Sequence, residues 1–305
     1  MKRILPWALI LVAAIAVGLI IARQRVHQMP SWYPHRITDP VARRAAANSA
    51  EHSLIDAFNA ASAAQAAETR ARLAAAAREN EKSPAQADAG RKPITLHFSE
   101  QELNAFFDKW EREFGWKEKA GKTIQDPAIA VESTELILAA TVATREFNTV
   151  LSLHFEPRLA DGKLSMNLAR VTAGTLPLPR AYYSRYERKL ETAVNAKLPT
   201  WREQADISPA GSANRAAVQA GMGELLLHAL HDEPAEPVIF LPNLAPGHSG
   251  SLPVKITDIN LDNKTLTLTM MPMDRTEREA LLAHLQEART LESGATASDK
   301  DQSTH

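Results

Sequence analysis

The first residues to consider for chemistry lie in the stretch GWKEKAGKT, which resembles a phosphate-binding loop. Gly115 and Gly121 are separated by five residues, whereas the G-x-x-x-x-G-K-[ST] motif has four, and a helix rather than a strand is expected before the stretch. A phosphate cradle needs a strand leading in and a helix leading out, so that backbone N–H groups converge on the ligand. We therefore expect no nucleotide binding, and interpret Lys117, Lys119 and Lys122 as part of a solvated loop.

The stretch GHSGS nearly matches the nucleophile elbow G-x-S-x-G of serine hydrolases. Ser251 stands where the final glycine belongs, and proline-rich sequence flanks the stretch instead of a strand and a helix. A hydrolase using His248 and Ser249 is therefore the weakest of the function classes considered, and no catalytic residues are assigned.

Two histidines at helical spacing are the only suggestion of a metal site. His228 and His231, followed by Asp232 and Glu233, place two imidazoles at i and i+3, but further ligands would be needed to hold an ion. Histidine near a helix C-terminus is also favoured by the helix dipole, without any metal. We expect no metal and no cofactor. Because the chain has no cysteine, Cys-ligated zinc, iron–sulfur clusters and thiol catalysis are excluded.

The remaining candidate is a set of large apolar side chains that combines a helical stripe with alternate positions of predicted strands. Two interpretations stay open: a close-packed core, or a groove between helix and sheet that holds an acyl chain. Methionine-rich strand faces suit irregular ligands and plain cores alike. The candidate ligand-binding residues are Phe106, Phe107, Trp110, Leu138, Leu153, Phe155, Met166, Leu268 and Met270.

Residues 4–22 form an unbroken run of 19 uncharged, mostly apolar positions. As a helix this run covers roughly 28 Å, enough to cross a bilayer. No small-x-small cleavage site follows the run, because Ile20 and Ile21 lead directly into Ala22 and Arg23. We expect a retained, single-pass anchor in the cell inner membrane. A short N-terminal tail usually stays in the cytoplasm, so residues 23–305 are expected outside it.

The charge distribution argues against a nucleic-acid partner. Residues 1–37 contain five basic and no acidic side chains, which leaves 30 basic against 36 acidic in the other 268 residues. A mildly acidic outer part is repelled by phosphate backbones, whereas basic residues flanking an anchor suit lipid headgroups. We therefore divide the chain first at residue 37, after a membrane anchor and its flanking segment.

Residues 38–91 are predicted to form an alanine-rich helical stalk and a linker. Residues 42–77 include 17 alanines and neither glycine nor proline, so helix propensity is high. Thr38 or Asp39 can cap this helix, and Pro40 suits its first position. With few large apolar residues, the helix is interpreted as a spacer. The alternative is a helix that binds a partner or associates with its own copies.

Residues 92–289 are predicted to form one α+β domain, followed by a polar, disordered tail at 290–305. Ser99 and Glu102 form a capping box at the start of a helix, as do Asp274 and Glu277 later. Three predicted strands alternate between apolar side chains and polar or small ones, so we expect the apolar side of each strand to be covered. The apolar positions are Leu136, Leu138, Ala140 and Val142 in the first strand, Leu151, Leu153 and Phe155 in the second, and Leu164, Met166 and Leu168 in the third. Asp161-Gly162 predicts a tight hairpin. Helices are predicted at 180–198 and 208–231, before two further strands.

The stretches ITLHFSEQELNAFF and LSLHFEPRLADGKLSMNLARVTAGTLPLP, together with the anchor, resemble the YpmS-like family of bacterial membrane-anchored extracytoplasmic proteins. The resemblance covers about residues 94–110 and 128–200. It implies a single-pass protein outside the cytoplasm, with a curved sheet wrapped around a long helix like the tubular lipid-binding folds. The alanine-rich stalk and the proline-rich insertion at 232–253 depart from the family, and no catalytic residue carries over.

These observations favour a non-enzymatic extracytoplasmic protein that binds a lipid or another hydrophobic partner near the membrane. The alternative is a structural or assembly factor of the cell envelope, acting through protein–protein contacts along the stalk and an exposed face.

Overall fold

The computed structural model describes residues 24–33, 37–76, 91–114, 124–143, 148–208, 211–244, 250–262 and 264–286. Five sequence predictions fall outside these residues: the membrane span at 4–22, the linker at 77–90, the loop at 115–123, the His248–Ser249 pair and the tail at 290–305. Within the described ranges, none of the helices is long and apolar enough to cross a membrane.

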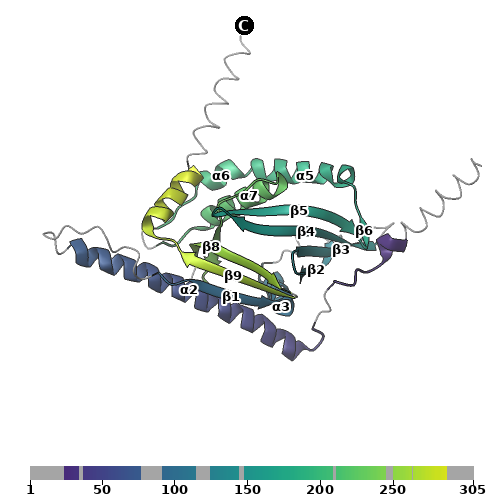
Figure 1. The fold of residues 1–305 in the computed structure, drawn as a ribbon, viewed down its shortest axis with the longest axis horizontal. Helices are drawn as coiled ribbons and strands as arrows, with labels where there is room; N and C mark the ends of the chain where they lie inside the picture. Colours follow the sequence, from purple (N-terminus) through teal and green to yellow (C-terminus); the bar gives the residue numbers. More distant parts are fainter. Residues whose placement is uncertain are drawn as a thin grey trace, which may run out of the picture.

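The described strands form two antiparallel sheets, which confirms the predicted α+β class (Figure 1). Most neighbouring strands are joined by hairpins, but Ile94–Ser99 pairs with Thr265–Pro272, far away in the sequence. The antiparallel sheet structure is curled into a half-barrel. The first sheet has the order β1 (Ile94–Ser99), β9 (Thr265–Pro272), β8 (Ser251–Asp262) and β7 (Val238–Pro242). The second sheet has the order β2 (Ile124–Val131), β3 (Leu136–Ala143), β4 (Asn148–Ala160), β5 (Lys163–Ala173) and β6 (Leu176–Pro177).

Helices lie on two sides of these sheets, with α2 on one side and α5, α6 and α7 on the other (Figure 1). The helices are α2 (Pro40–Ala76), α3 (Glu100–Phe114), α5 (Arg180–Asn195), α6 (Leu198–Glu203), α7 (Arg215–Leu230) and a last helix at 275–286. α7 begins later than predicted, because Asn214 rather than Ser208 caps it and accepts a hydrogen bond from the Ala217 N–H at 2.8 Å.

The predicted local signals are present at the predicted places. Ser99 and Glu102 form the capping box of α3, since the Ser99 N–H donates to the Glu102 carboxylate at 2.9 Å and the Glu102 N–H donates to Ser99 Oγ at 3.2 Å. Asp274 and Glu277 make the same reciprocal pair before the last helix. The β4–β5 hairpin turns at Asp161 and Gly162, both with positive φ.

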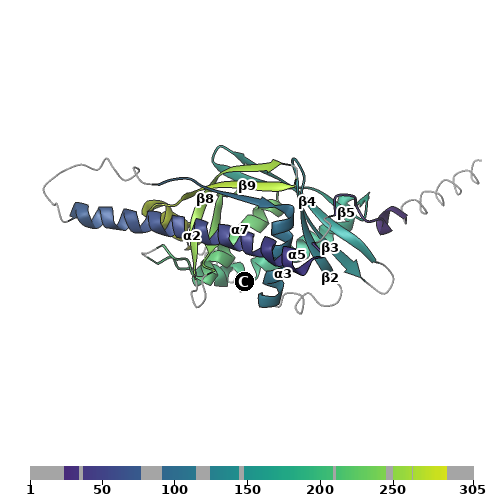
Figure 2. The same cartoon turned by 90° about the horizontal axis from the view of Figure 1, so that it is seen from below.

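The alanine-rich helix α2 is part of the core, so its interpretation as a spacer is wrong. Figure 2 shows α2 lying across the molecule, and its residues contact α3 and strands of the first sheet. Ala57 and Ala61 are 2% and 0% exposed, while Leu54 and Phe58 pack against the same cluster. Alanine lets a helix backbone approach a sheet closely, so a helix poor in large residues still buries a continuous face. The domain divisions at 37, 91 and 289 stay predictions.

The main core lies between α2 and the first sheet. Its buried members come from α2, the four strands of the first sheet and the hairpin end of the second sheet. They are Ala50, Ala57, Ala61, Leu96, Phe98, Leu164, Leu241, Leu252, Val254, Ile256 and Met270.

Candidate functional site

The structure separates the nine predicted ligand-binding residues into two groups. Met270 is fully buried in the main core, and Phe106, Met166 and Leu268 pack against that core. The burial of these four side chains agrees with a close-packed core rather than with a ligand-binding groove. Leu138, Leu153 and Phe155 lie on the second sheet, Phe107 on α3 is 40% exposed, and the side chain of Trp110 lies outside the described part.

The second sheet carries an apolar face that is partly open to solvent. Leu138 on β3 pairs with Ile129 on β2 and with Leu153 on β4, and directly opposed residues of neighbouring strands point to the same face. Leu138 is 40% and Leu151 36% exposed. We call this the open apolar face, and it comprises Ile129, Leu136, Leu138, Leu151, Leu153 and Phe155. Leu138 and Leu151 are its exposed members and the other four are partly buried. Exposed apolar side chains grouped on one face are typical of a binding site.

The prediction of which sheet face is covered was wrong for β3 and β4. Ile137 and Ala139 are 0% and 6% exposed, whereas Leu138 between them is the exposed residue. In β4 the buried positions are likewise Ser152 and His154 rather than Leu151. The face that carries Ile137, Ser152 and His154 is buried because other parts of the chain pack against it. It is not the more apolar face of the sheet.

The covered face of the second sheet holds a chain of buried polar groups. His154 Nδ1 lies 2.7 Å from a Glu135 carboxylate oxygen, and His154 Nε2 lies 3.1 Å from Ser152 Oγ. Ser152 Oγ continues the chain to Thr172 Oγ1 at 2.6 Å, and Arg170 donates to the same Glu135 oxygen at 2.8 Å. Burial lowers the pKa of His154 below its ordinary value, although the hydrogen bond with Glu135 opposes this effect.

The order Ser152, His154, Glu135 is that of a serine-hydrolase triad, and its environment decides what it can do. Ser152 is 0% and His154 1% exposed, and the Trp32 ring packs edge-on against the His154 ring with centroids 5.5 Å apart. A substrate carbonyl therefore has no path to Ser152 Oγ in this arrangement. We interpret this series of hydrogen bonds as a structural network that connects three strands of the second sheet. The sequence signal was Ser-x-His, which puts both residues on one strand face.

An N-terminal segment, residues 24–33, covers this face and is bound to the ends of β4 and β5. The Thr175 N–H donates to the Arg25 carbonyl at 2.9 Å, and the Thr149 hydroxyl donates to the Val26 carbonyl. His27 Nδ1 lies 3.0 Å from the Asn148 carbonyl. The residues that directly follow the predicted membrane span are thus attached to the same sheet that carries the open apolar face.

Helix α3 is fastened to the edge of the second sheet by two polar side chains. Asn104 accepts from the Ile129 N–H at 2.8 Å and donates to the Ile129 carbonyl at 2.7 Å, as a neighbouring strand would. Glu100 accepts from the Val131 N–H at 3.2 Å. Burial raises the pKa of Glu100 above its ordinary value, against the opposing effect of that hydrogen bond. These contacts fix the first turns of α3 against the edge strand β2.

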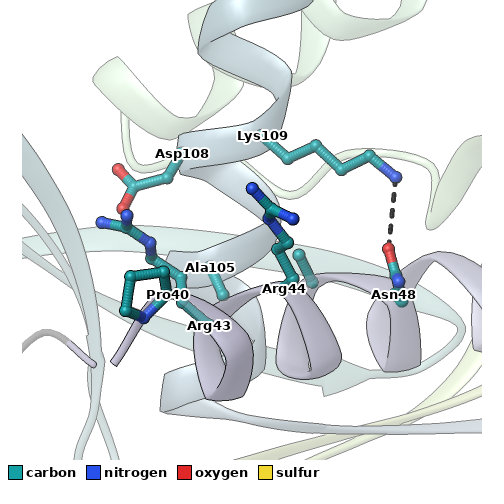
Figure 3. A pocket seen from close by; sticks show the side chains of 8 residues that line it. Pro40, Arg43, Arg44, Asn48, Ala105, Asp108 and Lys109 are labelled. Carbon is teal, nitrogen blue, oxygen red and sulfur yellow. Dashed lines mark hydrogen bonds between the residues drawn. The ribbon is translucent and has the colours of Figure 1, made fainter. Parts of the chain in front are cut away.

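A solvent-open cavity of about 450 Å³ lies between α2 and α3 (Figure 3). Arg43, Arg44 and Asn48 reach it from α2, and Asp108 and Lys109 from α3. Lys109 forms an ion pair with Glu51 and lies 3.5 Å from the Asn48 side-chain oxygen, while Arg43 and Asp108 point toward each other. A lining of charged and amide groups is unsuited to an acyl chain.

Two further cavities have linings of mixed polar and apolar character, and the smaller one includes Leu225, Phe240 and Leu281. One of about 470 Å³ is lined by Trp32, Glu100, Glu132 and Lys264, and one of about 140 Å³ by Glu224 and His228, each with other residues. None of the nine predicted ligand-binding residues lines any of the three cavities. The cavity of about 140 Å³ is below the roughly 300 Å³ typical of ligand pockets, so the open apolar face is the better candidate for an acyl chain.

The two histidines considered for metal binding have separate acidic partners. His228 Nδ1 lies 3.5 Å from Glu233, and His231 Nε2 lies 3.2 Å from Glu191 on α5. Among the described residues, no group of three or more potential ligands is close enough to hold an ion. The histidines connect the end of α7 to its neighbours.

No family model matches the chain, and neither a curated protein nor a solved structure matches it. The resemblance to the YpmS-like family therefore stays a prediction, and the functional argument depends on the chain's own geometry.

Proposed function

We propose that the protein is a single-pass, non-enzymatic membrane protein whose extracytoplasmic α+β domain binds a lipid or another hydrophobic molecule near the bilayer surface. The observation that carries this proposal is the open apolar face, where Leu138 and Leu151 are 40% and 36% exposed. Solvent contact of such side chains is unfavourable by about 25 cal/mol for each Å² of apolar surface, and a bound acyl chain would remove it.

The attachment of the N-terminal segment supports a ligand that comes from the membrane. Arg25 and Val26 contact the ends of β4 and β5, only a few residues after the predicted span at 4–22. On this proposal the second sheet stays close to the lipid headgroups, within reach of an acyl chain. A curled sheet beside a long helix is also the arrangement expected of the tubular lipid-binding folds. We propose that the domain resembles these folds.

Native mass spectrometry of the full-length protein in detergent tests the proposal directly. We expect lipid adducts on the wild-type protein and their loss in Leu138→Gln and Leu151→Gln, because an amide on the open apolar face opposes burial by an acyl chain. Met222→Gln is the matched control, since Met222 on α7 is 65% exposed and lies away from that face.

The result that contradicts the proposal is a wild-type protein that carries no lipid from the membrane. Adducts that survive both leucine substitutions would also contradict it, because the lipid would then be bound elsewhere. Circular dichroism of each variant ensures that only folded protein is compared.

The alternative, an envelope assembly factor that acts through protein contacts, stays a prediction. Self-association through α2 would have to use its outer surface, since Ala57 and Ala61 already face the main core. Photo-crosslinking from Ala63, an exposed position of α2, separates the two functions in cells. Protein adducts at Ala63 support the assembly factor, whereas lipid adducts at Leu138 support the proposed lipid-binding function.

A further inference from the structure

Helix α5 exposes an aromatic stripe that nothing in the described structure covers. Tyr182 and Tyr186 are 71% and 68% exposed, and Leu190 is 43% exposed. These residues lie four apart and therefore share one side of the helix. The inward side of α5 carries Tyr183 and Glu187, which are partly buried, and Val194, which is buried, and Leu190 lies at the border between the two sides. Two tyrosines this exposed, on one helix, indicate a surface that is covered in the cell.

Basic side chains accompany the stripe. Arg185, Arg188 and Lys189 are exposed, and Lys189 Nζ lies 5.9 Å from the centre of the Tyr186 ring. The two acidic residues of α5 are turned toward other partners. Glu187 lies 3.7 Å from Arg180, and Glu191 lies 3.2 Å from His231. The outward side of α5 is therefore both aromatic and cationic.

The position of α5 brings this side close to the predicted membrane span. Arg25 is hydrogen-bonded to Thr175, and α5 begins at Arg180, five residues further along the chain. Figure 1 shows the short helix at residues 24–27 beside β6, from which the chain continues into α5. Since the predicted span ends at residue 22, the first turns of α5 are held near the bilayer surface.

We infer that α5 lies on the surface of the bilayer as an interfacial helix, with Tyr182 and Tyr186 at the depth of the headgroups and its basic residues on anionic lipid phosphates. Tyrosine prefers this depth because its ring is apolar and its hydroxyl is polar. A helix with an apolar side and Lys or Arg beside it has the composition of a surface-bound helix. This inference depends on the membrane anchor of the proposed function, but not on lipid binding at the open apolar face.

Depth-dependent fluorescence quenching of the full-length protein in liposomes tests the inference. The chain has no cysteine, so a single label can be placed at Ala193→Cys, an exposed position eleven residues after Tyr182 and on the same side of α5. Ala71→Cys, exposed on α2, is the control. We expect a nitroxide at the lipid headgroup to quench the label at 193 in phosphatidylglycerol vesicles and to leave the label at 71 unquenched.

Two variants connect the quenching to the residues named. Arg185→Gln should reduce the ratio of docked to undocked helix about fivefold, because a basic residue near an anionic surface contributes about 1 kcal/mol. Tyr182→Ser combined with Tyr186→Ser should abolish quenching at 193. All three substituted residues are exposed, so we expect both variants to retain the fold.

Equal quenching of the labels at 193 and 71 would overturn the inference, as would a crosslink from 193 in cells to a protein instead of a lipid. Extraction of membranes with alkaline carbonate tests the membrane anchor separately, and so distinguishes failure of this inference from failure of the proposed function. A protein released by carbonate has no anchor, which defeats both proposals. A protein that stays in the membrane with an unquenched label at 193 defeats only the surface position of α5.

Discussion

Gly174 lies directly against the backbone of Arg25. A Cβ added at Gly174 would overlap the carbonyl oxygens of Arg25 and Val26 and would lie 2.8 Å from that of Gln28, and φ at Gly174 is +59°. Only glycine fits both the backbone conformation and the close approach at this position. This contact attaches the N-terminal segment to the second sheet.

Gly174→Ala should therefore release the N-terminal segment. Gly162→Ala is a matched control, because φ at Gly162 is +71° but an added Cβ meets nothing within 4 Å. Both variants lose about 1 kcal/mol from the positive φ, whereas only Gly174→Ala also loses the contacts of Arg25. Trypsin should cleave after Arg25 faster in Gly174→Ala than in Gly162→Ala. Equal cleavage of the two variants would contradict this assignment.

The packing of α2 is tested by enlarging one alanine on each side of the helix. Ala61 is fully buried, whereas Ala63 is exposed. Ala61→Leu should lower the free energy of unfolding by about 1–3 kcal/mol through overpacking, while Ala63→Leu should leave it nearly unchanged. Chemical denaturation followed by circular dichroism measures both. A spacer helix would tolerate the two substitutions equally.

The two hydrogen bonds between Asn104 and Ile129 should make Asn104 sensitive to substitution. Asn104→Leu leaves the Ile129 N–H and carbonyl without their partner, at a cost of about 1–3 kcal/mol for each group that stays buried. Asn104→Asp keeps an acceptor for the Ile129 N–H and should be affected less. Hydrogen exchange at the Ile129 amide reports the contact itself, and an amide equally protected in all three proteins would refute its role.

The buried position of His154 predicts a loss of stability in mild acid. Its pKa is lowered in the folded protein, so the stability linked to it is present above its unfolded pKa, near 6.5, and is lost as pH falls below that value. Arg170, Glu135 and Glu132 are the charged groups that act on it.

His154→Gln removes the titration and keeps polar atoms toward Ser152 and Glu135. The loss of unfolding free energy between about pH 7.5 and pH 5.5 should be smaller in this variant than in the wild type. The comparison of the two slopes cancels other titrating groups. Parallel slopes would show that His154 does not contribute to the pH dependence.

Local signals in the sequence predicted local structure well. The capping boxes at Ser99 and Asp274, the Pro40 helix start and the Asp161-Gly162 hairpin each depend on residues within a few positions of one another. Their hydrogen bonds form inside one segment, so no knowledge of distant contacts is needed. The α+β class followed from the same signals, because strands predicted in hairpins pair antiparallel.

The sequence could not predict which candidate ligand-binding residues are buried in the main core and which lie on the open apolar face, because both faces of the second sheet contain apolar residues. Ile137 and Leu138 are neighbours with similar hydrophobicity, yet one is buried and the other exposed. What decides is the cover supplied by residues such as Trp32, more than a hundred positions away. The role of α2 was misjudged for a related reason, since counting large side chains overlooks the close approach that Ala57 and Ala61 permit.

The bonds from α3 to β2 have a consequence for how this protein can meet others. Asn104 occupies the hydrogen-bonding groups of Ile129, and Glu100 accepts from the amide of Val131, so α3 occupies this part of the outer edge of β2. A strand from another protein therefore cannot pair with Ile129 and Val131 unless α3 is first displaced.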